Sequence, residues 1–100
     1  MPLTASSWTA QDLREFVVAL EHEQEVYEHI ATQHLPGADR AMLEARREGL
    51  LRKLYPVRKR LQPMKRDWPL VRGGMPQSVV ARVETRICRV RSLQTELGIN

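Results

Sequence analysis

The chain has 100 residues, of which 42% are hydrophobic, 28% charged and only 5% aromatic. These values predict one small domain over residues 1–100, because the length is too short for two separate hydrophobic cores. No run approaches the roughly 18–20 apolar residues of a membrane helix, so no membrane partner is expected. A single cysteine, Cys88, excludes an intrachain disulfide and favours a reducing, cytoplasmic location.

The net charge of +4 conceals an uneven distribution along the chain. Residues 1–38 carry one basic and six acidic side chains, a net charge of −5, whereas residues 39–100 carry fifteen basic and six acidic ones, a net charge of +9. This asymmetry has two interpretations. The basic part binds nucleic acid or an acidic partner, or the acidic first helix neutralises the basic helices inside the fold.

The first predicted helix spans about residues 9–34. Thr9 and Asp12 have the spacing of a capping box, and apolar residues then recur at helical intervals. The apolar series is interrupted after Leu20, where Glu23 or Gln24 takes the expected core position. Such a polar insertion is more typical of a register-setting position, or of one end of a core, than of a functional site. Residues 35–39 contain proline and glycine and predict a tight connection to the next helix.

The second predicted helix spans about residues 39–62, with Asp39 as its N-terminal cap. Its apolar positions alternate four and three residues apart, and the series continues across Pro56, so a kinked but continuous helix is favoured over a helix that stops there. Residues 63–75 contain two more prolines and the pair Gly73-Gly74. They predict a long loop, and long loops in compact domains are often functional or mobile.

The third predicted helix spans about residues 76–97 and has apolar residues at the same alternating spacing. Pro76 suits its first turn, and Gly98 followed by Ile99 predicts a Schellman ending. Three long helices with seven-residue apolar spacing predict an all-α fold, an antiparallel three-helix bundle with seams like those of coiled coils. Narrow apolar faces and few aromatic residues make a dimer plausible.

Few residues suggest enzyme or metal chemistry. His22, Glu25 and His29 share one helical face, as metal ligands would, but a solvated polar face explains them as well. The chain has no glycine-rich phosphate loop, no Cys-x-x-Cys pair and no recognisable nucleophile motif. We therefore expect no enzyme activity, catalytic residue, metal, cofactor or small-molecule substrate.

The first functional hypothesis is a small intracellular adaptor or regulator that binds another protein, or a second copy of itself, through helix–helix contacts. Tryptophan is favoured at the energetic centres of interfaces, and Trp68 lies in the predicted loop, where it serves either as a partner anchor or as a plug over one end of the bundle. The predicted contact surface combines this loop with the seam of the third helix: Trp68, Leu70, Val83, Ile87 and Val90.

The alternative hypothesis is a protein that binds nucleic acid with little sequence preference. Basic residues recur every seven positions in the second helix and form a further stripe in the third, a pattern suited to contacting successive phosphates. The predicted contacts are Arg46, Arg52, Lys53, Lys59, Arg60, Arg66, Arg82, Arg86 and Arg89. Tyr55 and Trp68 lie near this region and are candidates for stacking on unpaired bases.

Overall fold

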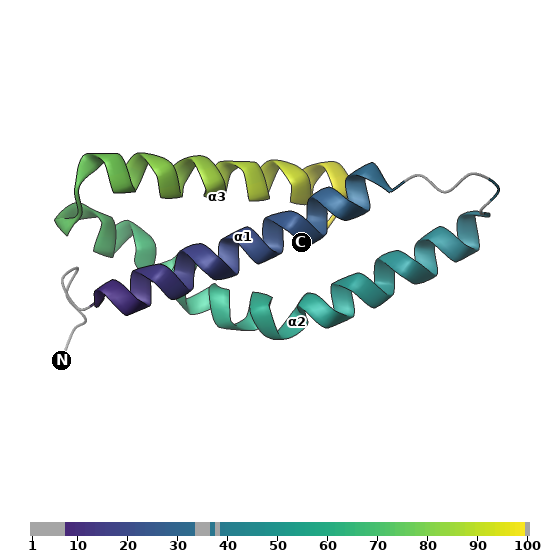
Figure 1. Cartoon of the computed structure of the whole chain (residues 1–100), viewed down its shortest axis with the longest axis horizontal. Coiled ribbons are helices and arrows are strands. Elements are labelled where there is room, and N and C mark those ends of the chain that lie inside the picture. The colour runs from purple at the N-terminus through teal and green to yellow at the C-terminus, as the bar shows by residue number, and fades with distance from the viewer. Residues whose placement is uncertain (1–7, 34–36, 38, 100) are drawn as a thin grey trace.

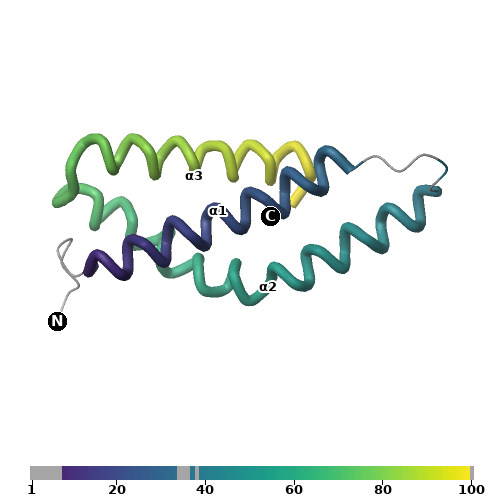
Figure 2. The backbone as a smooth tube through the Cα atoms, in the orientation of Figure 1, coloured from purple at the N-terminus to yellow at the C-terminus, as the bar shows by residue number. Residues whose placement is uncertain are grey.

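The computed structural model describes residues 8–33, 37 and 39–99. It is an all-α three-helix bundle, as predicted, with the helices α1 (Ala10–Thr32), α2 (Arg40–Val71) and α3 (Gln77–Leu97). A single 3-10 turn, η2 (Arg72–Gly74), joins α2 to α3. The helices follow one another up, down and up, so α1 and α3 run in the same direction and α2 runs against both (Figures 1 and 2).

Helix α1 packs against both other helices and crosses the long axis of the molecule between them (Figure 1). Its start is fixed by the predicted capping box: Asp12 N donates to Thr9 Oγ1 at 3.1 Å, and Thr9 N donates to Asp12 Oδ2 at 2.8 Å. The predicted end of this helix at residue 34, and most of the predicted connection 35–39, lie outside the described residues. The cap residue Asp39 of α2 accepts from Met42 N at 2.8 Å, as predicted.

The prediction that α2 ends near residue 62 and is followed by a loop over residues 63–75 is wrong. The helix continues to Val71 with Pro56, Pro63 and Pro69 inside it. A proline has no backbone N–H group, so the carbonyl oxygen four residues earlier loses its helical hydrogen bond. All three prolines are exposed, so these carbonyl oxygens face the solvent side of the helix. On the opposite side the buried residues keep their seven-residue spacing beyond Pro63: Leu54, Leu61 and Trp68.

The core has two parts. The first gathers Phe16, Ala19, Leu20, Leu61, Trp68 and Val83, and the second gathers Tyr27, Leu54, Val90 and Leu93. Near the first part the rings of Trp8, Phe16 and Trp68 meet, with centroids 5.1 to 6.2 Å apart. Glu23 lies between the two parts along α1 and is buried, which confirms the polar interruption that the sequence places there.

The C-terminal end of α3 has the predicted Schellman geometry. Gly98 adopts a positive φ of 67°, Gly98 N donates to Thr95 O, and Ile99 N donates to Gln94 O at 2.8 Å. Ile99 packs against the second part of the core. At the same end of α3, Arg47 Nη2 donates to Leu97 O at 2.5 Å and ties α2 to α3. None of the helices within residues 8–33 and 39–99 has the length and apolarity that crossing a bilayer requires.

Candidate functional site

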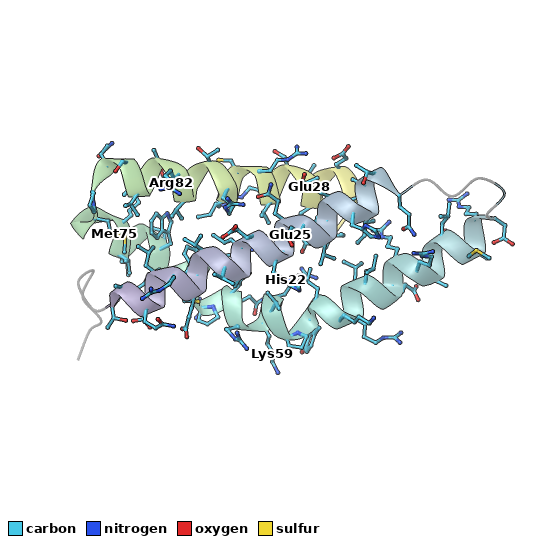
Figure 3. All side chains as sticks on the ribbon, in the orientation of Figure 1. His22, Glu25, Glu28, Lys59, Met75 and Arg82 are labelled. Carbon is cyan, nitrogen blue, oxygen red and sulfur yellow. The ribbon has the colours of Figure 1, made fainter. Side chains whose placement is uncertain are left out.

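The outer face of α2 is covered by cations. The term outer face denotes the side of α2 that carries two series of exposed basic side chains, each with a seven-residue spacing. The first series is Arg46, Lys53 and Arg60, and the second is Arg52, Lys59 and Arg66. Between residues 49 and 66 the helix carries seven basic residues and no acidic one. Figure 3 shows Lys59 projecting from this face, away from α1.

The helical geometry explains why these cations face outward. Leu54 and Leu61 are fully buried on the opposite side of α2, and the helix turns by about 100° per residue. This rotation places Pro56 and Pro63 between the two basic series. Prolines bend a helix away from themselves, so the outer face is the convex side of α2.

The acidic residues of α1 do not pair with the outer face. The ion pairs found among the described residues join Arg40 to Glu44, Arg72 to Glu84, and both Arg58 and Lys65 to Glu23. Glu23 is thus the one acid of α1 in an ion pair within that part of the chain. Among the described residues, this single carboxylate is therefore the only acid of α1 that neutralises a basic side chain of another helix by an ion pair.

A polar cavity of about 450 Å³ opens beside the outer face. Side chains of all three helices line it: Glu23 from α1, Gln94 from α3, and Tyr55, Arg58, Lys59, Gln62 and Lys65 from α2. Lys59 belongs to both the cavity and the outer face, so the two are continuous. Its ammonium group lies 5.6 Å from the centre of the Tyr55 ring, a cation–π distance.

The floor of the polar cavity is a hydrogen-bonded network around Glu23, whose side chain is only 1% exposed. Tyr27 Oη donates to Glu23 Oε2 at 2.8 Å, and Lys65 Nζ donates to Glu23 Oε1 at 2.9 Å. Gln94 Nε2 donates to Tyr27 Oη at 3.4 Å. Burial raises the pKa of Tyr27 above its ordinary value, and the adjacent Glu23 carboxylate adds to the rise. A buried carboxylate needs such partners, since an isolated one would be strongly disfavoured.

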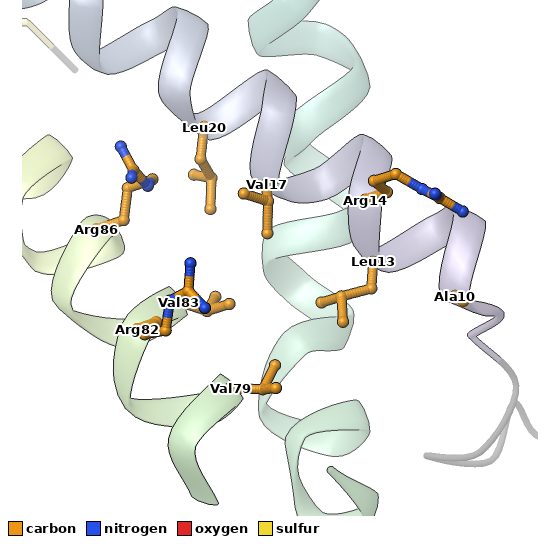
Figure 4. A pocket seen from close by; sticks show the side chains of 9 residues that line it. All are labelled: Ala10, Leu13, Arg14, Val17, Leu20, Val79, Arg82, Val83 and Arg86. Atoms are coloured by element: carbon orange, nitrogen blue, oxygen red, sulfur yellow. The ribbon is translucent and has the colours of Figure 1, made fainter. Parts of the chain in front are cut away.

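An apolar groove of about 360 Å³ lies between α1 and α3 (Figure 4). Its lining includes the apolar residues Leu13, Val17, Leu20, Val79 and Val83. Arg82 and Arg86 extend from α3 beside this lining, whereas the guanidinium group of Arg14 points away from it. Arg86 Nη1 donates to Gln24 Oε1 at 3.0 Å, which fixes this arginine at the edge of α1.

The five residues predicted to bind a protein partner do not form one exposed surface. Trp68, Val83 and Val90 are buried in the core, and Ile87 is half-buried. Leu70 alone is well exposed, at 60%. As long as the bundle is closed, the three core residues are unavailable to a partner, because the predicted loop is helical and its apolar side continues the inner face of α2.

Trp68 is a core residue on the inner face of α2. Its ring is 3% exposed and lies against Phe16, with centroids 5.7 Å apart. Trp68 Nε1 donates to Glu84 Oε2 at 3.4 Å, and Arg72 also pairs with this carboxylate. The ring therefore cannot stack on a base while the bundle is closed, and Tyr55 remains as the exposed aromatic side chain beside the basic residues.

The nine predicted nucleic-acid contacts fall on two separate surfaces. The six on α2 are all exposed and share its outer face, whereas Arg82, Arg86 and Arg89 belong to α3. Helix α1 separates the two sets, because Arg60 lines a pocket between α1 and α2 while Arg82 and Arg86 line the apolar groove between α1 and α3. Figure 3 shows Arg82 and Lys59 on opposite sides of α1.

The residues of the polar cavity were not predicted as a site. The sequence held a signal for them, because Glu23 and Gln94 both occupy positions in otherwise apolar helical series, on different helices. What it could not show is that the two positions meet in space. His22 and Glu25 lie exposed on α1 (Figure 3), and no group of three or more His, Cys, Asp or Glu residues suited to a metal occurs in the described ranges.

Comparisons with protein-family models, with curated proteins and with solved structures find no match to this chain.

Proposed function

We propose that the protein binds nucleic acid through the outer face of α2, by contacts to phosphates and with little preference for sequence. The observation that supports this most strongly is that all six members of the two basic series are exposed and that none of them is in an ion pair among the described residues. Exposed cations that are not held in ion pairs are available to displace the counterions of a polyanion, the main source of sequence-independent affinity.

The spacing of the two series suits a contact with a chain of phosphates. Seven residues of helix advance about 10.5 Å along its axis, so each series presents three cations over about 21 Å. Contacts of this kind position a nucleic acid without reading its bases, because phosphates carry no sequence information. The expected activity is thus strongly salt-dependent binding to strands of unrelated sequence.

The test is a salt titration of binding to labelled oligonucleotides, measured by fluorescence anisotropy. Two variants each remove one series: R46A/K53A/R60A and R52A/K59A/R66A. The slope of log affinity against log salt is negative, and each variant is expected to make it shallower by about 2, because about three phosphate contacts are lost. The loss should be similar for unrelated sequences.

The matched control removes the same number of charges from α3, as R82A/R89A/R91A. All three side chains are exposed, so the fold should tolerate the change. This control is expected to retain most of the wild-type slope, because the proposed interface lies on α2. Equal losses in the control and in the two α2 variants would mean that net charge alone drives binding, and would overturn the assignment to this face.

We propose a second function for the apolar groove, that of docking an acidic amphipathic helix from another protein. The groove offers an apolar lining of about the size of two or three side chains, and Arg82 and Arg86 beside it are complementary to carboxylates flanking such a helix. This keeps the adaptor hypothesis but moves its contact surface from the core residues to the groove.

A synthetic helix with a leucine face flanked by glutamates is a direct probe of the groove. It should bind more tightly than the same helix flanked by lysines, and R82E should reverse that order. R89E serves as the control, because Arg89 does not line the groove. Equal binding of the two peptides to the wild-type protein would contradict this second proposal.

A further inference from the structure

Tyr55 is the exposed aromatic residue within the basic surface. Its side chain is 58% exposed, it lines the polar cavity, and Lys59 lies over its ring. An aromatic ring beside cations that follow a phosphate backbone is the usual platform for bases of single strands, because every base has a face on which to stack. Among the described residues, Tyr55 does not belong to either part of the core.

The polar cavity next to this ring has donors and acceptors that can form hydrogen bonds with the edge of a base. Gln62 and Gln94 each provide an amide that both donates and accepts hydrogen bonds. Lys65 is 31% exposed, and its ammonium group has three N–H donors, more than its contact with Glu23 requires. The volume of about 450 Å³ falls within the range of small-molecule pockets.

We infer that the nucleic acid bound by the outer face of α2 is single-stranded, and that one unpaired base stacks on Tyr55 and enters the polar cavity beside Gln62 and Gln94. This inference rests on the proposed function, since Lys59 and its series would hold the phosphates that bring the base to the cavity. A duplex cannot supply this contact without opening, because its bases are already stacked and their edges paired.

The first experiment separates bases from phosphates. Binding is compared between an oligothymidylate of about 12 nucleotides and an abasic strand with the same number of phosphates. The wild-type protein should prefer the thymidylate by about tenfold, measured as the ratio of the two affinities, and Y55L should lose that preference. The matched variant Y55F, which keeps the ring, should retain the preference.

The outcomes separate the inference from the proposed function. If the wild-type protein binds both strands equally, with a steep salt slope, the inference is overturned and phosphate binding by the outer face stands. A preference that survives in Y55L would also overturn it, because the bases would then be recognised elsewhere. If neither strand binds at low salt, the proposed function itself fails.

A second measurement places the base in the cavity rather than only on its rim. In nitrogen–proton NMR spectra, the side-chain amide signals of Gln62 and Gln94 should shift when the thymidylate is added and should stay in place with the abasic strand. Shifts confined to α2 around Tyr55, with the Gln94 amide unmoved, would show that the base does not enter the cavity.

Discussion

The inner and outer faces of α2 have the same spacing and opposite roles. Leu54, Leu61 and Trp68 recur every seven residues and are buried, while Arg52 and Lys59, two members of one outer series, recur at the same interval and are exposed. A seven-residue spacing therefore assigns residues to a common face of a helix, and the chemistry of the side chains then decides which face is covered.

The prolines distinguish the two faces further. Pro56 and Pro63 lie among the outer cations, where a missing backbone donor exposes a carbonyl group to water instead of burying it. On the inner face the same prolines would interrupt the packing against α1. The position of a proline relative to the apolar series is thus as informative as its presence, and here it marks the convex side of a continuous helix.

The largest effect is expected from removing the inner-face residue Trp68. W68A should lower the free energy of unfolding by about 3–5 kcal/mol, because it leaves a large cavity against Phe16 and Leu61. L70A, two residues away and exposed, should change it by less than about 0.5 kcal/mol. Urea denaturation measures both. Wild-type stability in W68A would show that this ring is not part of the core.

Much of the fold could be predicted from the sequence because local signals determine it. The capping box at Thr9, the cap at Asp39 and the ending at Gly98 all lie within a few residues of the groups they bond. The end of α2 could not be placed correctly from residues 63–75. Proline signals favour a loop there, and only packing against α1 and α3 shows that Trp68 and Val71 continue the inner face.

The site was predictable in part. The basic series of α2 follow from helical spacing, and all six members are exposed where the sequence placed them. The polar cavity depends on contacts between residues far apart in the chain, such as Lys65 with Glu23 and Gln94 with Tyr27. Such contacts follow from the relative rotation of three helices, which periodicity within each helix does not determine.

An intermediate effect on the free energy of unfolding is expected at alkaline pH from Tyr27, a buried member of the hydrogen-bonded network around Glu23. The pKa of Tyr27 is raised in the folded protein, so between the unfolded value near 10 and the folded value the unfolded chain loses a proton that the folded chain keeps. Stability from this group is therefore complete below pH 10 and is lost as the pH rises above it, by at most about 1.4 kcal/mol per pH unit.

The variant Y27F isolates this contribution, because it keeps the ring and removes the titrating hydroxyl group. Urea unfolding at pH 9 and at pH 11 should show a smaller loss of stability for Y27F than for the wild-type protein. All other ionisable groups are the same in both proteins, so their effect cancels in the comparison. An identical loss in the two proteins would mean that Tyr27 ionises as readily in the folded chain as in the unfolded one.

The smallest effect on stability is expected from the outer face. R52A/K59A/R66A should change the free energy of unfolding by less than about 0.5 kcal/mol, because none of the three side chains is buried or held in an ion pair in the described residues. Removing like charges also lowers their mutual repulsion, so added salt should stabilise the wild-type protein at least as much as the variant. A loss above about 1 kcal/mol would mean that these cations are neutralised within the fold by the acidic helix α1. The same result would weaken the case for a surface kept open to phosphates, so this measurement comes before any binding experiment with that variant.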